Sequence, residues 1–259
     1  MLSLLVMLLA GVDGGTEPST PARLLVERTT STEYVNELLD DGRYVRFGTE
    51  DNGPVHVWSP RTLKRDGAVV IYVHGFFTDV DAAMREHRLT AQFRDSGRNA
   101  VFIVPEARSW RTDPILWPEL PKLLTNVEQR TKTRLPSGPI VLVGHSGAYR
   151  TLAGWLTEPR VKQVLLVDGL YGNEKDFEAW LDAGEGRQLV LVGYDTKQRG
   201  EWLSKKRPSV TVDTLPWLYD ELPATVRKAS LVHVHSERLD HMGLVTDGRL
   251  LPWLLHAFR

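Results

Sequence analysis

Continuous runs of Val, Ile and Leu recur along the chain from residue 67 onwards. Two shorter segments with alternating polar and apolar residues, YVRFG near residue 44 and VHVWS near residue 55, precede them and are separated by EDNGP, which predicts an antiparallel hairpin. Continuous apolar runs are typical of strands buried on both faces of a parallel sheet. The runs are GAVVIYVHG (67–75), NAVFIVPEA (99–107), PIVLVGH (139–145), KQVLLVDG (162–169), RQLVLVGYD (187–195) and ASLVHVHS (229–236).

Helical periodicity fills the gaps between these runs. Apolar residues recur at i, i+3, i+4 and i+7 over residues 120–127 and again over residues 149–156. The segment from 79 to 97 predicts one helix with Leu89 and Phe93 facing inward. The whole pattern predicts a three-layer α/β sandwich around a mostly parallel sheet of about eight strands.

Composition narrows the class of protein further. A chain of 259 residues with 42% hydrophobic and 25% charged residues, and no internal linker-like tract, predicts one α/β domain over residues 23–259. A formal net charge of -1 offers no basic surface for nucleic acid or anionic membrane, so the expected partner is a small molecule. The absence of cysteine excludes disulfides, thiolate metal sites and thiol catalysis. The oligomeric state is left open.

The first residues carry a short apolar run, Leu2 to Ala10, followed by a polar linker. The run resembles the apolar region of a secretory signal, but no Lys or Arg precedes it, so a signal peptide and linker over residues 1–22 remain one of two alternatives. A cleaved signal would imply a secreted or periplasmic protein, and its absence a cytoplasmic one. The run is too short to span a bilayer, and no integral membrane segment is expected.

The run PIVLVGH leads directly into Ser146, Gly147 and Ala148 and then into an amphipathic helix. Small residues on either side of Ser146 permit a tight turn that exposes its hydroxyl at the carboxyl end of the sheet, and the following helix N-terminus favours developing negative charge there. The usual pattern is G-x-S-x-G, and Ala148 replaces the last glycine. We interpret Ser146 as a nucleophile rather than as part of a plain turn.

With GHSGA as the nucleophile elbow on the fifth strand, the chain resembles α/β-hydrolase-fold proteins from about residue 43 to its end. The resemblance is to the superfamily and identifies no subfamily or substrate. It implies an oxyanion hole formed by the backbone N–H of Gly147 and a second N–H from VHGFF, with Phe76 as first choice and Phe77 as fallback. We interpret His74 in the same segment as a structural turn residue.

The resemblance also implies that an acid and then a histidine follow the serine. His241, a few residues beyond the last strand, is the expected general base. The other histidines after Ser146 are predicted to lie within that strand (His233, His235) or in the terminal helix (His256).

The identity of the acid is left open between two residues. Asp168 ends the sixth predicted strand among apolar neighbours, and Asp195 ends the seventh at the position that most members of the superfamily use. Because a triad carboxylate is usually buried beside the imidazole, burial favours Asp168 whereas topology favours Asp195, and Asp168 is our first choice. Asp240, next to the histidine, is a weaker candidate.

Only about seventeen residues separate Gly169 from Arg187, which leaves room for one crossover helix and no large cap. We therefore expect an open site, lined by Phe76, Phe77, Tyr171 and Trp110, that binds a small ester or amide without cofactor or metal.

Two other classes of function are compatible with parts of the sequence. HVHSERLDH has a likeness to the ligand run of metal-dependent hydrolases, with His233, His235 and His241 as ligands, although its spacing is too long. A hydrolase fold can also serve as a binding module without activity.

Overall fold

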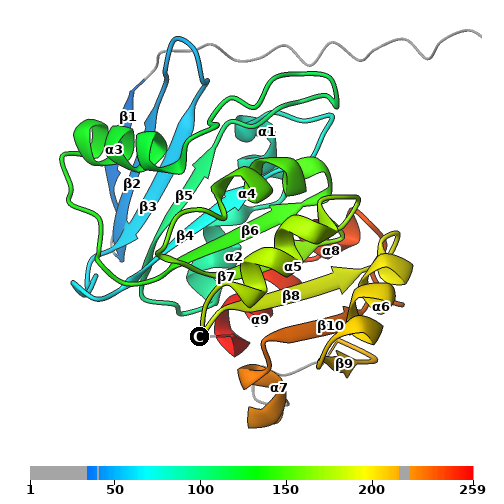
Figure 1. Cartoon of the computed structure of the whole chain (residues 1–259). Coiled ribbons are helices and arrows are strands. Elements are labelled where there is room, and N and C mark those ends of the chain that lie inside the picture. The colour runs from blue at the N-terminus through cyan, green and yellow to red at the C-terminus, as the bar shows by residue number, and fades with distance from the viewer. Residues whose placement is uncertain (1–33, 40, 216–221, 259) are drawn as a thin grey trace, which may run out of the picture.

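A ten-stranded mixed sheet forms the centre of the computed structural model, which describes residues 34–39, 41–215 and 222–258 (Figure 1). The strand order across the sheet is β1-β2-β3-β5-β4-β6-β7-β8-β10-β9. The bounds are β1 Val35–Leu38, β2 Gly42–Phe47, β3 Val55–Pro60, β4 Ala68–Val73, β5 Ala100–Pro105, β6 Ile140–His145, β7 Val161–Val167, β8 Gln188–Gly193, β9 Val210–Val212 and β10 Leu231–His235.

The pairing of the strands follows the hydrophobic pattern. The alternating segments form the antiparallel pair β2 and β3, and β3 continues antiparallel to β5. All six continuous apolar runs are parallel strands, because β5, β4, β6, β7, β8 and β10 pair side by side in the same direction. The predicted hairpin and the mostly parallel sheet are therefore confirmed.

Helices cover both faces of the sheet (Figure 1). One apolar core joins β4, β6 and β7 to α3, α4, α5 and α6, and the second core joins the opposite face to α1, α2, α7, α8 and α9. This is the predicted three-layer sandwich. The bounds are α1 Val80–Glu86, α2 Leu89–Asp95, α3 Leu120–Thr131, α4 Tyr149–Trp155, α5 Glu174–Asp182, α6 Lys197–Lys206, α7 Ala224–Lys228, α8 Gly243–Thr246 and α9 Leu250–Ala257.

Two sequence predictions are corrected by the structure. The strand count rises from about eight to ten because β1 and β9 are short edge strands, largely exposed, that carry no apolar run. The single helix expected over residues 79–97 is two helices, because Arg88 between them adopts a left-handed conformation with φ 49°. The carbonyl of His87 at this break accepts a hydrogen bond from the side chain of Gln92 at 2.6 Å. Leu89 and Phe93 face inward as expected.

The topology brings chemically active residues to one edge of the sheet. Strands β4, β6, β7, β8 and β10 all run in the same direction, so the loops that follow them meet at their carboxyl ends. A single helix, α5, lies between β7 and β8, and no large cap interrupts the sheet there. None of the helices in the described ranges has the length and apolar character needed to cross a membrane. Residues 1–22, for which a signal peptide was one alternative, lie outside the described ranges.

Candidate active site

Ser146 occupies a sharp turn between β6 and α4. Its φ of 54° places it in the left-handed region that non-glycine residues rarely adopt, and residues Ser146–Ala148 form one 3-10 turn before the helix. Gly75 lies against it, because a Cβ built on Gly75 would be 2.7 Å from the Ser146 Cβ and 3.3 Å from its Oγ. A strained turn of this kind raises a serine hydroxyl above the end of a strand.

Ala148 replaces the last glycine of the elbow pattern without strain. Its φ of -61° is ordinary right-handed backbone, so this position has no conformational need for glycine. What the position requires is a small side chain, because a Cβ built on Gly144 of the preceding strand would lie 3.2 Å from the Ala148 Cβ. The departure from the pattern is therefore compatible with the turn.

His241 and Asp168 form a close pair beside this turn. The Nδ1 of His241 lies 2.7 Å from Oδ2 of Asp168, whose side chain is completely buried. Because the carboxylate accepts, Nδ1 carries the proton and Nε2 is left as the basic nitrogen of the neutral ring. The backbone of Asp168 is left-handed, with φ 43°, and its N–H donates a hydrogen bond to the Val192 carbonyl at 2.7 Å.

The start of the loop after β8 forms a cradle of donors around Asp168. The backbone N–H groups of Tyr194, Asp195 and Thr196 donate to its carboxylate at 2.8–3.1 Å, and the Thr196 hydroxyl adds a further bond at 2.9 Å. Burial alone would raise the pKa of the Asp168 carboxyl, but the hydrogen bonds from His241, Thr196 and Tyr194 outweigh it and hold that pKa well below its usual range. The hydrogen bond to Asp168 in turn raises the pKa of His241 above its ordinary value, against the effect of burial.

Asp195 lies at the margin of this cluster. Its carboxylate is 3.8 Å from Nδ1 of His241, its side chain is 52% exposed, and it accepts a hydrogen bond from the Tyr171 hydroxyl at 3.3 Å. Of the two candidate acids, Asp168 is therefore the one with the buried, short contact to the imidazole. The main contact of Asp195 with the Asp168–His241 pair is the hydrogen bond from its backbone N–H to the Asp168 carboxylate.

His145 connects the serine turn to the histidine loop. It is buried, its ring lies 4.6 Å from that of His241, and its Nε2 donates to the His241 backbone carbonyl at 3.1 Å. Burial, with the nearby charge of His241, lowers the pKa of His145 to about 3, so its ring is neutral at ordinary pH. The residue directly before Ser146 therefore contacts the loop that carries His241. In the described ranges no direct hydrogen bond links their side chains, and such bonds often tighten only when substrate binds.

The segment after β4 places the candidate oxyanion donors. The ring of Phe76 lies against Gly147, where a Cβ would be 2.6 Å from its ring atoms. The Phe77 N–H, the fallback donor, already bonds to the Ser109 carbonyl at 2.9 Å, which counts against it. The Phe76 N–H has no acceptor among the described residues, and the Gly147 N–H lies in the first turn of its helix, where amides lack intrahelical acceptors.

His74 is buried beneath this segment and paired with Glu106. Nε2 of His74 lies 2.8 Å from Glu106 Oε1, and Nδ1 donates to the Gly75 carbonyl at 2.8 Å. Glu106 also accepts from the N–H groups of Val80 and Ala107. This network is fully internal, in keeping with a structural role for His74. Sequence reasoning missed Glu106 and His145, although both sit at the carboxyl ends of predicted parallel strands, which is a usable signal.

Aromatic side chains surround the turn as expected. Phe77 is 58% exposed and packs edge-on against Trp110 at 4.6 Å between ring centroids. Tyr171 lies on the other side, 6.3 Å from the ring of His241. The structure brings these residues around the turn, and their part in substrate binding stays a prediction.

The described residues offer one group that could hold a metal ion, formed by Asp168, Asp195 and His241, whose ligand atoms lie within 4.8 Å of one another. The two oxygens of Asp168 already accept five hydrogen bonds, a donor set that suits a proton-sharing pair better than a cation. The alternative grouping for a metal-dependent hydrolase is not formed by the described residues, because His233 and His235 contact each other on β10 and do not join His241.

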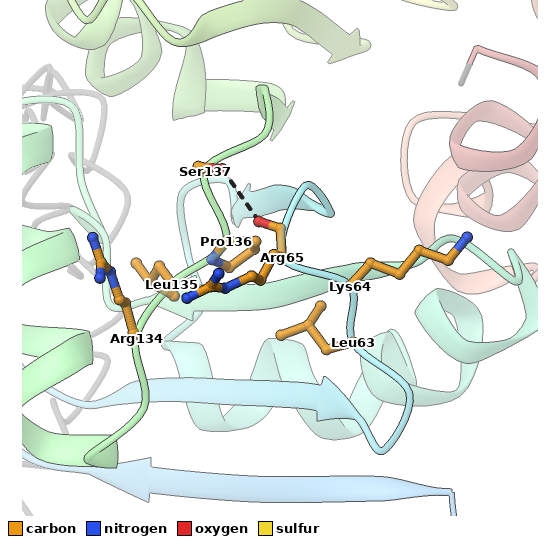
Figure 2. A pocket seen from close by; sticks show the side chains of 7 residues that line it. All are labelled: Leu63, Lys64, Arg65, Arg134, Leu135, Pro136 and Ser137. Atoms are coloured by element: carbon orange, nitrogen blue, oxygen red, sulfur yellow. Dashed lines mark hydrogen bonds between the residues drawn. The ribbon is translucent and has the colours of Figure 1, made fainter.

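A surface hollow of about 550 Å³ lies away from these residues (Figure 2). Its lining comes from the segments that precede β4 and β6, so it belongs to the amino ends of these strands, opposite the serine turn. The two lining segments are joined by a hydrogen bond from the Ser137 hydroxyl to the Arg65 carbonyl at 3.3 Å. The lining residues are Leu63, Lys64, Arg65, Arg134, Leu135, Pro136 and Ser137.

Comparison with solved structures finds esterases with a similar fold at low sequence identity. The feruloyl esterase module from Clostridium thermocellum matches with a TM-score of 0.56 at 11% identity, over 90% of this chain and 97% of that one. An S-formylglutathione hydrolase from Agrobacterium tumefaciens matches with a TM-score of 0.52 at 12% identity, over 87% and 98%.

A carboxyl esterase from the fungus Tuber melanosporum matches with a TM-score of 0.52 at 10% identity, over 89% of this chain and 87% of that one. No protein-family model and no curated protein sequence matches this chain. At these identities the likeness concerns the fold.

Proposed function

We propose that this chain, whose fold is that of the α/β hydrolases, is a serine hydrolase that cleaves a carboxylic ester through an acyl-enzyme on Ser146. The observation that carries the proposal is the buried Asp168–His241 pair at 2.7 Å beside a serine in a left-handed turn. The similar folds named above belong to esterases, which supports an ester over an amide.

The first half of the reaction forms the acyl-enzyme. Nε2 of His241 takes the proton of the Ser146 hydroxyl as its oxygen attacks the carbonyl carbon, and Asp168 stabilises the imidazolium that results. The carbonyl oxygen becomes an oxyanion that accepts hydrogen bonds from the N–H groups of Gly147 and Phe76. The ester C–O bond then breaks, and His241 gives its proton to the leaving alcohol.

The second half repeats these steps with water. His241 removes a proton from water, the hydroxide attacks the acyl carbon, and the bond to the Ser146 oxygen breaks with return of the proton to that oxygen. The products are a carboxylic acid and an alcohol. The open position of Phe77 and Tyr171 leaves space for an aromatic or extended group on either side of the ester.

A non-catalytic binding protein of the same fold is the competing function. Such a protein has no need for a buried carboxylate that accepts five hydrogen bonds, one of them from a histidine. It also has no need for a strained serine backbone, which costs ~1–3 kcal/mol. Both features support the hydrolase.

Labelling with a fluorophosphonate probe, combined with turnover of 4-nitrophenyl acetate, tests the proposal. We expect the wild-type protein to be labelled once per chain. Ser146→Ala should lose the label and reduce kcat by ~10³-fold or more, whereas Ser137→Ala, at the opposite end of the sheet, should keep both. An unlabelled wild-type protein, or equal labelling of the Ser146→Ala protein, would contradict the serine mechanism.

A further inference from the structure

Two arginine side chains meet at one carbonyl oxygen beside the serine turn. Arg108, in the loop after β5, donates from Nη2 to the backbone carbonyl of Arg111 and from Nε to that of Trp110. Arg150, in the first turn of α4, donates from Nη1 to the same Arg111 carbonyl at 3.4 Å. The two guanidinium groups are therefore close neighbours of equal charge.

Neither guanidinium forms an ion pair with a carboxylate in the part of the chain that the structure describes. Arg108 is only 7% exposed. Burial, followed by the charge of Arg150, lowers the pKa of Arg108, and the charge of Asp113 opposes this shift. A buried guanidinium group is normally paired with an anion, so Arg108, with the partly exposed Arg150 beside it, forms a site of positive charge that favours an anionic ligand.

The arginine pair lies next to the proposed nucleophile. Arg150 follows Ser146 by four residues, which is about one helical turn, on the same helix start. The Arg108 guanidinium lies 5.8 Å from the centroid of the Phe76 ring, and the same ring also packs against Gly147, directly after the serine. The Phe76 ring therefore contacts both the Arg108 guanidinium and the residue that follows the proposed nucleophile.

We propose that Arg108 and Arg150 form a subsite for a carboxylate carried by the ester substrate. The proposal rests on the serine hydrolase function above and names the class of its substrate, an anionic ester. Nη1 of Arg108 and Nη2 of Arg150 donate no hydrogen bond to the described residues and are available to a ligand. Guanidinium groups bind carboxylates through paired, charge-assisted hydrogen bonds. The arginine pair therefore favours a carboxylate as ligand over a neutral acyl chain.

Arg150 is the partly exposed member of the pair, and further contacts hold its side chain. Arg150 also donates from Nε to the Tyr149 hydroxyl at 3.1 Å and lies over that ring, so its guanidinium is fixed in place before a ligand arrives. Fixed donors reduce the entropy lost on binding. A carboxylate on the acyl group and one on the alcohol share the same recognition chemistry, and matched substrates distinguish them.

The test compares esters that differ only in charge. On the acyl side, mono-4-nitrophenyl adipate is compared with its methyl ester, and on the alcohol side 4-acetoxybenzoate is compared with methyl 4-acetoxybenzoate. The ratio of kcat/KM for the anionic ester to that for the neutral ester is measured in each protein. We expect a ratio well above one in the wild type for one of the two pairs, which identifies the side that carries the carboxylate.

The variants Arg150→Gln and Arg108→Gln should lower this ratio at least ~10-fold, because each removes a charge-assisted bond. Arg65→Gln, an exposed arginine at the other end of the sheet, removes the same charge and should leave the ratio unchanged. Because a ratio cancels any loss of folded protein, a purely structural role for Arg108 would lower both rates equally. A wild-type ratio at or below one for both pairs, or ratios that the variants do not change, would overturn the proposal.

Binding to the Ser146→Ala protein separates this proposal from the proposed hydrolysis. Calorimetry with mono-4-nitrophenyl adipate and 4-acetoxybenzoate, and with their methyl esters, needs no turnover. Tighter binding of an anionic ester, lost in the Ser146→Ala/Arg150→Gln protein, would support the subsite even if the wild type hydrolysed nothing. Equal binding of anionic and neutral esters would overturn the subsite even if the serine were catalytic.

Discussion

At the scale of single residues, the arrangement around Asp168 is what distinguishes this site from a plain loop cluster. A buried carboxylate is stable only when its oxygens are satisfied, and here three backbone N–H groups, one hydroxyl and one imidazole satisfy them. Asp195 contributes one of those N–H groups while its own side chain remains in solvent. The two acids that the sequence left open therefore have different environments.

Replacing each acid by asparagine should separate their roles. Asp168→Asn should lower kcat by ~10³–10⁴-fold, because an amide cannot hold His241 in the correct tautomer or stabilise the imidazolium. Asp195→Asn keeps the backbone donor to Asp168 and should change kcat less than ~10-fold. Turnover of 4-nitrophenyl acetate measures both, and similar small effects from the two variants would show that neither residue is the acid.

The pH profile checks that Asp168 acts through His241. The hydrogen bond from Asp168 raises the pKa of His241, so the activity of the wild type should fall as pH drops through a value above the usual one for histidine. In Asp168→Asn protein the low-pH limb of kcat/KM should move to lower pH, since the anionic acceptor is gone. An unmoved limb would assign it to another group.

Much of this site could be predicted from residue types and their order, and some of it could not. Ser146 and His241 are predicted by motif and topology, and the apolar neighbours of Asp168 favour it as the acid, but the donors that the loop after β8 supplies to its carboxylate are visible only in the structure. Arg108 and Arg150 lie 42 positions apart in the chain and meet at the carbonyl of Arg111, a contact between a loop and the start of α4 that has no periodic signal. Hydrophobic patterns predict strands, but they do not predict where backbone carbonyls point.

At the scale of elements, the sequence predicts the buried central strands of the sheet but not its edge strands. The six buried strands can be recognised in the sequence because both of their faces are apolar. The edge strands β1 and β9 carry mixed side chains that are exposed or only partly buried, and their formation depends on the neighbouring strands. The break between α1 and α2 depends on a left-handed Arg88, which the repeating apolar pattern of residues 79–97 does not reveal. Local propensity predicts the elements that bury much apolar surface and misses those that tertiary contacts impose.

The contact between α6 and β10 depends on Gly200. A Cβ at this position would lie 2.4 Å from Nε2 of the buried His233, so helix and strand approach more closely than any larger residue allows. We expect Gly200→Ala to destabilise the protein by about 1–3 kcal/mol through overpacking. Chemical denaturation monitored by circular dichroism measures this change.

Gly154→Ala provides the matched control for that prediction. Gly154 is also a helical glycine, in α4, but the nearest atom to its added Cβ is the Pro118 carbonyl oxygen at 4.0 Å. With no contact to relieve, alanine should stabilise the helix by up to ~1 kcal/mol. A stabilising Gly200→Ala substitution would show that α6 can move away from β10 without cost.

At the scale of the whole molecule, buried histidines tie stability to pH. Burial lowers the pKa of His87, lowers that of His145 to about 3 and lowers that of His233 to about 4. In the unfolded chain these side chains bind protons near pH 6.5. Between that pH and the folded pKa values the unfolded state therefore binds more protons, and stability falls as pH falls.

His233→Leu should reduce this acid sensitivity. Both ring nitrogens of His233 lack hydrogen-bond partners, so leucine removes a titrating group without breaking a bond. The free energy of unfolding should then decline less steeply between pH 6.5 and 4, by up to ~1.4 kcal/mol per pH unit. Urea denaturation at a series of pH values measures the slope. Leu191→Met, on the adjacent strand position, should keep the wild-type slope, and an equal slope in His233→Leu would contradict the prediction.

Ser146 and Asp168, the two residues on which the proposed chemistry depends most, both have left-handed backbones at φ 54° and φ 43°. Glycine adopts such angles without penalty, so selection for thermal stability alone would favour replacing Ser146, whereas replacing Asp168 by glycine would leave its buried N–H donors without an acceptor. A laboratory screen for heat-resistant variants of this chain would then enrich for inactive ones unless activity were selected at the same time. The conflict between thermal stability and the proposed activity is therefore concentrated at Ser146.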